Sequence, residues 1–339
     1  MCLQKRLFEM QSTFNIYPGS LSMDNIQHLL STSTKIKLDS RCWDAVNASR
    51  QVVAQVITDN RTVYGINTGF GLLAHTIIPP EQLALLQRNL LLSHAAGTGD
   101  LISDEMVKLI LLLKINSLAR GYSGVRPLLL EALVALYNHE VYPCVPAKGS
   151  VGASGDLAPL AHLCLPLIGE GSARVNGIVV SGKDALIAAG LKPIDLAPKE
   201  GLALINGTQV STAFALYHLL KAQQLLSAAA LIGAMTVDAA AGSDAPFSEE
   251  IHAVRGQKGQ IVIAKVLRDC LVNSAIREAH LDCSRVQDPY SLRCQPQVLG
   301  ACLDNLRHAE AILMREANAV SDNPLVFAET NRIISGGNF

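Results

Sequence analysis

Residues 212–241 read TAFALYHLLKAQQLLSAAALIGAMTVDAAA, and this stretch points to a helical fold class. Alanine and leucine fall on nearly every side of the helix that it predicts, which is typical of a helix buried inside a bundle. In residues 299–320, apolar side chains recur every three or four positions, which also indicates a helix. Residues 81–92 and 104–119 predict two further helices, and Ser103 is the expected N-cap of the second.

Strand signal is scarce in the sequence. Its best case is residues 173–180, where Asn176-Gly177 separates two short runs of β-formers and predicts a type I′ hairpin. We therefore predict a mainly α fold, an elongated helical bundle with a smaller loop-rich N-terminal part and short β-hairpins. The expected divisions are a tail over residues 1–15, the loop-rich part over 16–200, and the start of a central helical bundle over 201–339.

Composition excludes several classes of protein. The 339 residues carry 28 Lys+Arg against 29 Asp+Glu, so the net charge is −1, and 49% of residues are apolar. This composition argues against disorder and against a protein that reads nucleic-acid phosphates, which needs a basic excess. Residues 222–237 are too short and polar for a membrane span of about 20 residues. The eight cysteines show no C-x-x-C spacing and no convincing metal cluster, and no signal peptide is seen, so we expect reduced cysteines and a cytoplasmic protein.

The most informative loop is residues 149–160, GSVGASGDLAPL. It is not a phosphate loop, because it lacks both G-x-G-x-x-G and the Lys-Ser/Thr ending of a P-loop, and no clear strand precedes it past Pro143 and Pro146. A plain Gly/Ser turn before a helix capped by Asp156 remains open as an interpretation.

A chemical interpretation of the same loop is also open. Three small residues allow the amide nitrogen of Gly155 to attack the carbonyl carbon of Ala153, because glycine tolerates unusual dihedral angles and leaves its nitrogen accessible. Loss of one water from the ring, and of a second from the Ser154 hydroxyl, leaves an electrophilic methylidene-imidazolone. Asp156 is a candidate for shuttling protons in that step.

The loop resembles the signature of the aromatic amino-acid ammonia-lyases. The resemblance runs from about residue 16 to 339 and includes YGINTGFG at 64–71, NGTQ at 206–209 and QDPYSLR at 287–293. It implies a methylidene-imidazolone made from Ala153, Ser154 and Gly155 without an external cofactor. It also implies a largely helical fold and a homotetramer whose active sites each draw on more than one subunit.

Removing ammonia from an amino acid is difficult because the leaving group is poor and the β-proton is weakly acidic. A general base supplies about 10²–10⁴-fold of the roughly 10⁶–10¹⁷-fold that enzymes achieve, so an electrophile must also act. The resemblance makes Tyr64 the candidate base and gives Tyr290 a proton-transfer or positioning role. A phenol is a weak base at neutral pH, and Tyr64 packed on Phe70 as an ordinary turn residue is the alternative.

The resemblance also implies a set of substrate-binding residues. Arg293 offers a bidentate fork suited to the substrate carboxylate, although an ordinary salt bridge is the alternative. Asn206 and Gln287 supply amide hydrogen bonds near the ring and the substrate, and each taken alone is more often a turn residue. Phe339 is expected to line the pocket.

His94 points to the substrate. The Ser93-His94 pair matches the histidine-acting members of the family, whereas phenylalanine-acting members carry an apolar pair there. The sequence Cys294-Gln295-Pro296-Gln297 also resembles the histidine branch. The expected reaction converts L-histidine to trans-urocanate and ammonia, the first step of histidine breakdown.

Two alternatives stay open. One is a tyrosine- or phenylalanine-acting lyase, or an aminomutase, using the same electrophile. The other is an inactive truncated partner subunit, because the sequence ends at 336–339 inside a motif that continues in family members, before an expected acidic residue. We expect the 339-residue chain expressed alone to be poorly soluble, with little or no lyase activity.

Overall fold

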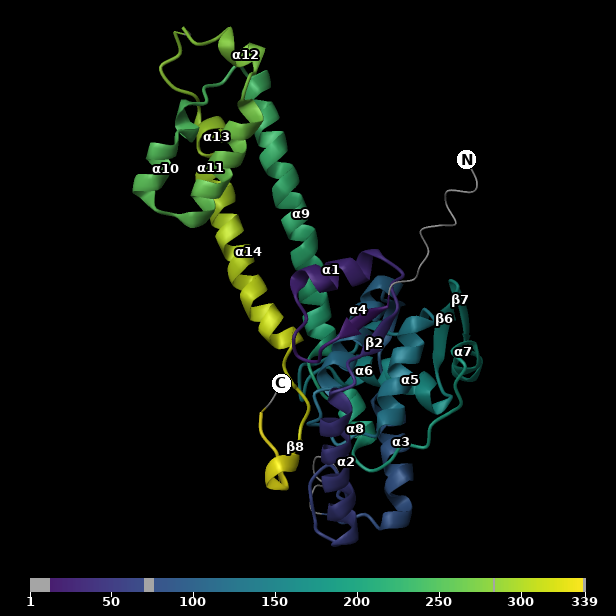
Figure 1. Cartoon of the computed structure of the whole chain (residues 1–339). Coiled ribbons are helices and arrows are strands. Elements are labelled where there is room, and N and C mark those ends of the chain that lie inside the picture. The colour runs from purple at the N-terminus through teal and green to yellow at the C-terminus, as the bar shows by residue number, and fades with distance from the viewer. Residues whose placement is uncertain (1–12, 70–75, 283, 338–339) are drawn as a thin grey trace. The chain divides into compact units, whose positions relative to one another are not determined.

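The computed structural model describes residues 13–69, 76–282 and 284–337. The chain divides into two compact units, unit 1 (Met1–Phe214 with Met314–Phe339) and unit 2 (Ala215–Leu313). Helices dominate both units (Figure 1), so the prediction of a mainly α fold is confirmed. The expected division between residues 200 and 201 stays a prediction.

The helices of unit 1 surround a buried core. Within it α4 packs on α5, and α3, α6 and α8 pack on one another. The helices are α1 (Met23–Ser31), α2 (Cys42–Thr58), α3 (Leu83–His94), α4 (Asp104–Leu118), α5 (Pro127–Asn138), α6 (Leu157–Cys164), α7 (Gly182–Ala188) and α8 (Glu200–Ile205), with 3₁₀ turns η2 (Pro80–Gln82), η3 (Leu165–Ile168) and η5 (Ala328–Thr330).

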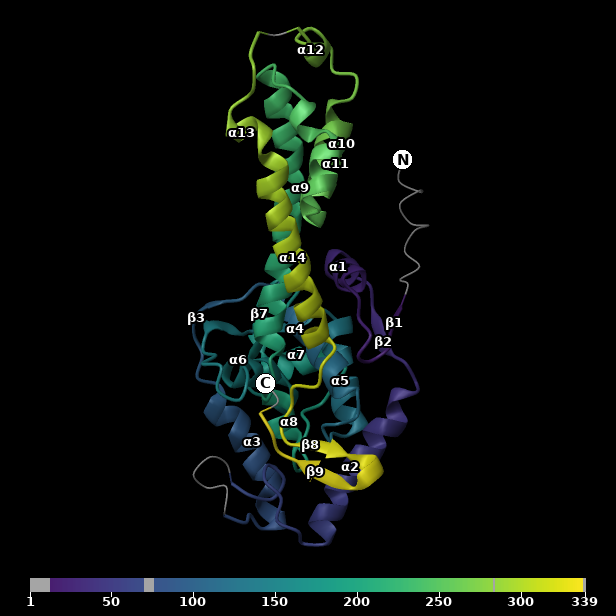
Figure 2. The same ribbon diagram turned by 90° about the vertical axis from the view of Figure 1, so that its left-hand side faces the viewer.

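Short strands tie the edges of unit 1 together. β1 (Phe14–Ile16) pairs in parallel with β2 (Ile36–Leu38), and β3 (Thr98–Leu101) pairs with β5 (Pro146–Lys148). β4 (Val141–Pro143), β6 (Ser172–Val175) and β7 (Ile178–Ser181) form an antiparallel sheet. β8 (Leu325–Phe327) pairs with β9 (Arg332–Ile334), and Figure 2 shows this hairpin beside α2, which it contacts.

The predicted hairpin is confirmed. Residues Asn176 and Gly177 join β6 to β7 and both have positive φ, at 51° and 77°, as a type I′ turn requires. Ser103 is also confirmed as an N-cap, because its side chain accepts a hydrogen bond from the Met106 amide at the start of α4. Every residue of α4 from Met106 to Leu118 is buried.

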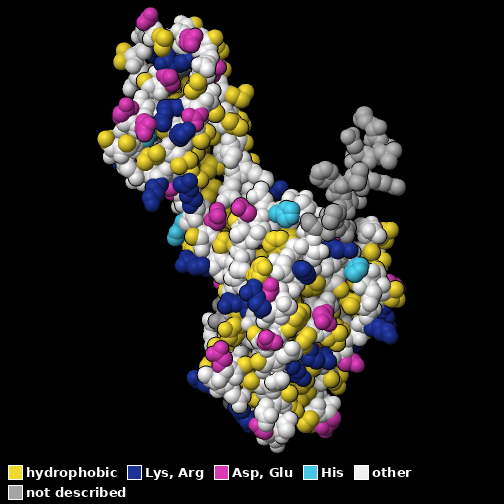
Figure 3. Space-filling view, viewed as in Figure 1, with side chains coloured by type: hydrophobic (Ala, Val, Ile, Leu, Met, Phe, Trp, Pro, Cys, Tyr) yellow, Lys and Arg dark blue, Asp and Glu magenta, His cyan; other side chains and the backbone are white. Residues whose placement is uncertain are grey.

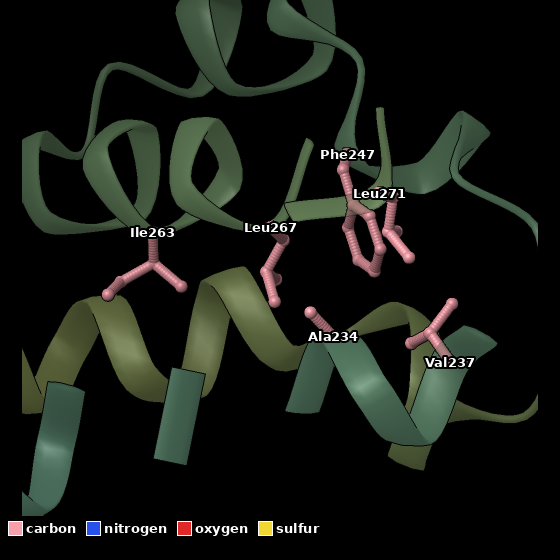
Figure 4. Close-up of a cluster of buried hydrophobic side chains, with 6 residues drawn as sticks. All are labelled: Ala234, Val237, Phe247, Ile263, Leu267 and Leu271. Carbon is pink, nitrogen blue, oxygen red and sulfur yellow. The ribbon is translucent and has the colours of Figure 1, made fainter. Parts of the chain in front are cut away.

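Unit 2 contains its own hydrophobic cluster (Figure 4). Ala234 and Val237 of α9 meet Phe247 and three residues of α11, with Leu299 and Leu303 of α14 packed against them. The helices that supply this unit are α9 (Gln209–Ala239), α10 (Glu249–Arg255), α11 (Lys258–Leu271), α12 (Ala275–Glu278), α13 (Tyr290–Arg293) and α14 (Gln295–Ala317), with the 3₁₀ turn η4 (Ala245–Phe247).

The prediction that residues 212–241 are buried on nearly all sides is wrong for the single chain. Helix α9 is exposed along most of its second half, where Leu225 and Met235 are 71% and 70% exposed, because the cluster of unit 2 covers only one of its faces. Figure 3 shows apolar side chains on the surface of this unit. By its length and composition, α9 is long and apolar enough to cross a membrane. One such helix is weak evidence for a membrane span, because the core helices of soluble proteins meet the same criteria.

Helix ends and cysteines also differ in part from expectation. Helix α14 starts four residues earlier than predicted because Pro296 is tolerated in a first helical turn. Among the six described cysteines, all free, Cys42, Cys144 and Cys164 are buried, whereas Cys270 and Cys302 are exposed rather than in a core.

Candidate active site

The Ala153-Ser154-Gly155 loop lies between β5 and α6 in unit 1. The expectation that no strand precedes the loop is wrong, because β5 lies directly before it. The two prolines are tolerated because Pro143 is the last residue of β4 and Pro146 the first residue of β5, where the missing amide hydrogen costs little. Ser154 has φ of +62° and Gly155 has φ of +82°, so two consecutive residues adopt the left-handed conformation. That conformation disfavours a side chain at Ser154 and folds the chain sharply.

Gly155 packs directly on the turn between α8 and α9. A Cβ atom at this position would lie 2.3 Å from the carbonyl oxygen of Gly207, which leaves room only for glycine. The two residues form an isolated parallel bridge, and the Asp156 amide donates a 2.7 Å hydrogen bond to the same Gly207 oxygen. The loop is therefore docked by backbone contacts.

Asn206 brings its side chain to the central serine. Its Nδ2 donates to the carbonyl oxygen of Ser154 at 2.7 Å and lies 2.9 Å from the Ser154 Oγ, and the residue is 1% exposed. The Asn206 Oδ1 atom is buried without a hydrogen-bond partner among the described residues. A buried orphan acceptor is costly, so it marks a place where a donor from outside the described chain would be bound favourably.

The Asp156 side chain does not cap helix α6, as it would in a plain Gly/Ser turn before a capped helix. It occupies the N-cap position of α6 but makes no side-chain cap there. Its carboxylate instead accepts from the Ser150 hydroxyl at 2.8 Å and from the amide and hydroxyl of Ser211 at 2.7 and 2.6 Å. Because Ser211 is in the first turn of α9, this buried acid joins the loop to that helix terminus.

Tyr64 lies on a braced turn in unit 1 and is half-buried. The Asn67 side chain accepts from the Val63 amide at 2.9 Å and donates to the Arg61 carbonyl at 2.7 Å, which fixes the turn. The next residue, Gly65, has φ of +76° and packs close to Leu202 of α8. Phe70, the proposed packing partner of Tyr64, lies outside the described residues.

His94 is the last residue of α3 and is half-buried. Its Nδ1 lies 2.8 Å from the Leu90 carbonyl oxygen, which only accepts, so Nδ1 carries the proton. In the neutral ring Nε2 is then a hydrogen-bond acceptor. The following loop is held by His162 of α6, whose Nε2 accepts from the Gly97 amide at 3.0 Å.

Three of the predicted site residues lie in unit 2, namely Gln287, Tyr290 and Arg293. Tyr290 and Arg293 are the first and last residues of the short helix α13. The Arg293 guanidinium lies 4.1 Å from the centre of the Tyr290 ring, and its Nε donates to the Asp288 carbonyl oxygen. Tyr290 is 70% exposed and Gln287 is exposed.

Phe339, the remaining predicted site residue, lies outside the described residues. A cavity of about 290 Å³ adjoins the loop in unit 1 and is lined by residues that include Ser150, Asp156, Ser211 and Phe214. Within the described ranges, no three His, Cys, Asp or Glu side chains are grouped so as to hold a metal ion.

Two buried lysines in unit 1 were not identified by the sequence analysis. Lys114 of α4 donates to the Asn206 carbonyl oxygen at 2.7 Å, and Lys199 pairs with Asp322 at 2.6 Å. A signal was present at Lys114, which interrupts the apolar run LILLLKINSL at 109–118. A lysine within an apolar stretch of a buried helix is costly to bury, and so it indicates a specific partner.

The chain belongs to the aromatic amino acid lyase family, whose model, described as "Aromatic amino acid lyase", matches residues 21–339. It is 58% identical over 329 residues to a histidine ammonia-lyase of Idiomarina loihiensis, covering 97% of this chain and 64% of that protein. The chain thus spans just under two thirds of the curated relatives that it matches.

Solved structures share the fold. The histidine ammonia-lyase from Trypanosoma cruzi is 36% identical with a TM-score of 0.86, over 96% of this chain and 61% of that one. A phenylalanine aminomutase from Pantoea agglomerans is 30% identical with a TM-score of 0.90, over 96% and 66%. The resemblance inferred from the sequence motifs is confirmed at the level of the family.

Proposed function

We propose that this protein is a histidine ammonia-lyase, which eliminates ammonia from L-histidine to give trans-urocanate, the first step of histidine degradation. One observation carries the proposal, the pair of contacts from Asn206 Nδ2 to the carbonyl and hydroxyl oxygens of Ser154. They hold the serine of the Ala-Ser-Gly sequence at a sharp left-handed turn. The name of the 58% identical relative supports histidine as the substrate.

We infer that Ala153, Ser154 and Gly155 form a methylidene-imidazolone, with no external cofactor. The local structure fits this group, because Gly155 lacks the side chain that would collide with Gly207 and because Ser154 and Gly155 both have left-handed φ values, which fold the chain sharply. Asn206 is placed to hold the ring through its amide. When formed, the group supplies the electrophile that activates the substrate for loss of ammonia.

The remaining residues bind the substrate and move its proton. Arg293 holds the substrate carboxylate through its guanidinium, which the Tyr290 ring and the Asp288 carbonyl orient. Tyr64 is the candidate base for the β-proton, and Tyr290 assists in proton transfer or positioning. Gln287 adds an amide hydrogen bond, and Phe339 lines the pocket.

His94 is the proposed determinant of specificity. Because its Nδ1 proton is directed to the Leu90 carbonyl, the Nε2 lone pair is the group left to accept the N–H of a substrate imidazole. A phenyl ring offers no such donor. A site built around a polar partner rejects a substrate that leaves the partner unpaired.

The active form is proposed to be a cytoplasmic homotetramer with active sites shared between subunits, without nucleic-acid or membrane partners. The apolar side chains exposed on α9, including Leu225, Ile232 and Met235, support burial of this helix against other subunits. Placement of Gln287, Tyr290 and Arg293 in unit 2 is compatible with a site assembled from several chains.

A substrate panel tests the proposal. The full-length protein is incubated with L-histidine, L-phenylalanine and L-tyrosine, and the unsaturated acid and β-amino acid products are separated by chromatography. Urocanate as the main product is expected. Cinnamate or coumarate as the main product would instead identify a lyase for phenylalanine or tyrosine, and β-amino acids would identify an aminomutase. Inactivation by borohydride or cyanide tests the electrophile separately.

A further inference from the structure

Lys114 is a buried charge that the proposed reaction does not use. It lies in the middle of α4, is 1% exposed, and is flanked along the helix by leucine and isoleucine. An ammonium group removed from water is unfavourable unless it is hydrogen-bonded. The position therefore needs a reason beyond packing, which leucine or methionine would serve better.

The hydrogen bonds of Lys114 lead to the active-site loop. Its Nζ donates to the Asn206 carbonyl oxygen at 2.7 Å and lies 3.4 Å from the Gln209 Oε1. The Asn206 side chain in turn contacts both oxygens of Ser154. Only Asn206 stands between the ammonium group and the serine whose hydroxyl must be eliminated.

Residues 206–209, which Lys114 contacts, also form hydrogen bonds with Ser321. The Ser321 Oγ accepts from the Thr208 amide at 3.2 Å and from the Gln209 Nε2 at 3.0 Å. Between these supports, the Gly207 carbonyl accepts the Asp156 amide. The position of residues 206–209 thus sets the position of the loop that packs on them.

The charged residues around Lys114 do not indicate that it serves as an ion-pair partner. The buried charged residues near it are Lys199, Asp322 and Asp156. Asp322 is paired directly with Lys199, and Asp156 accepts from Ser150 and Ser211. Lys114 directs its short hydrogen bond to a backbone carbonyl instead, which fixes a peptide rather than neutralising an acid.

We propose that Lys114 is a positioning residue for the active-site loop, acting through Asn206 to hold Ser154 in the geometry that ring closure requires. This inference rests on the proposed function. Ring closure forms a C–N bond between the Gly155 nitrogen and the Ala153 carbonyl carbon, and the Ala153 oxygen leaves as water with the amide hydrogens of Ser154 and Gly155. The Ser154 hydroxyl then leaves with the Ser154 α-hydrogen as the second water, which creates the methylidene. Such a step is fast only when the reacting atoms are held at about 3–3.5 Å, so a loosened support slows it strongly.

The chain supplies a matched control in Lys108, six residues earlier on the same helix. It is 7% exposed, and its Nζ donates to the Thr32 carbonyl oxygen at the end of α1, at 2.6 Å. Lys108→Met therefore removes a buried ammonium and one hydrogen bond to a backbone carbonyl, as Lys114→Met does, but at a site that makes no bond to Asn206.

The experiment follows ring formation by intact mass in freshly made full-length protein. We expect Lys114→Met to slow the loss of two waters by about 10- to 100-fold, the effect of losing one hydrogen bond to a charged group. Lys108→Met should mature at the wild-type rate although its melting temperature falls similarly. Lys114→Gln is the second variant if Lys114→Met does not fold, and it should also mature slowly.

A double-mutant cycle tests whether Lys114 acts through Asn206. Asn206→Ala keeps the carbonyl oxygen that Lys114 bonds but loses the amide contacts to Ser154. In that background Lys114→Met should slow ring formation by less than about threefold, because the side chain that links the two residues is gone. Full additivity, or normal maturation of folded Lys114→Met and Lys114→Gln proteins, would overturn the inference. If the wild-type protein itself retains both waters, the proposed function fails instead, whatever the role of Lys114.

Discussion

The carbonyl oxygen of Gly207 accepts a 2.7 Å hydrogen bond from the Asp156 amide, and this bond docks the Ala153-Ser154-Gly155 loop on the turn between α8 and α9. The two segments are about fifty residues apart in sequence. Their close approach depends on glycine at two positions, because Gly155 and Gly207 pack backbone against backbone. The loop is therefore positioned by main-chain contacts that a side chain at Gly155 would break.

Gly155→Ala is expected to abolish ring formation. Its methyl group would lie 2.3 Å from the Gly207 oxygen, and the left-handed conformation adds about 1–2 kcal/mol of strain. Gly152→Ala is the control, because Gly152 has φ of +68° but no atom within 4 Å of the added carbon. Intact mass should show the ring in Gly152→Ala and not in Gly155→Ala. A ring in both would mean that the close packing on Gly207 is unnecessary.

Arg293→Ala is expected to raise KM strongly and to lower kcat. Truncating one member of a buried charge pair costs about 2–5 kcal/mol, or roughly 30- to several-thousand-fold in kcat/KM. Arg307→Ala is the control, because the Arg307 side chain is 49% exposed and its guanidinium lies 3.8 Å from the partly exposed Asp304 carboxylate. Steady-state kinetics on histidine measure both. An effect of Arg293→Ala under threefold would make this residue an ordinary salt-bridge partner.

His94→Leu is expected to reduce turnover of histidine more than turnover of phenylalanine. The leucine removes the proposed acceptor for the substrate imidazole and replaces it with an apolar side chain. His139→Leu is the matched control, since the His139 Nδ1 likewise bonds the carbonyl four residues earlier, at 2.9 Å from Ala135. The ratio of kcat/KM for the two substrates is the measurement, and equal losses on both would remove His94 from substrate recognition.

Burial lowers the pKa of Lys114 to about 8 from 10.5. Between these two values the unfolded chain keeps a proton that the folded chain has lost, so this group makes the protein more stable as pH rises from about 8 to 10.5. The gain is about 3 kcal/mol over that range. Urea unfolding at pH 7.5 and pH 10 should show this gain in the wild type relative to Lys114→Met. An identical pH dependence in both proteins would contradict it.

The sequence predicted the helical class, the Asn176-Gly177 turn and the Ser103 cap, because these depend on periodicity and local chemistry. It did not predict the role of Asp156, whose hydrogen bonds to Ser211 are contacts across 55 residues. It also missed Lys114, since nothing local identifies its partner Asn206, 92 residues away. Burial of α9 was overpredicted because composition does not distinguish a helix covered by its own chain from one left exposed.

The central claim is that Ala153, Ser154 and Gly155 become an electrophilic ring, and intact mass tests it most directly. The purified full-length protein should weigh less than its sequence by two waters, and fragmentation should place the loss between Ala153 and Gly155. Ser154→Ala, which has no hydroxyl to eliminate, should fold normally but lack the double water loss and lyase activity. A wild-type mass equal to that of the unmodified sequence, or near-normal turnover by Ser154→Ala, would contradict the account.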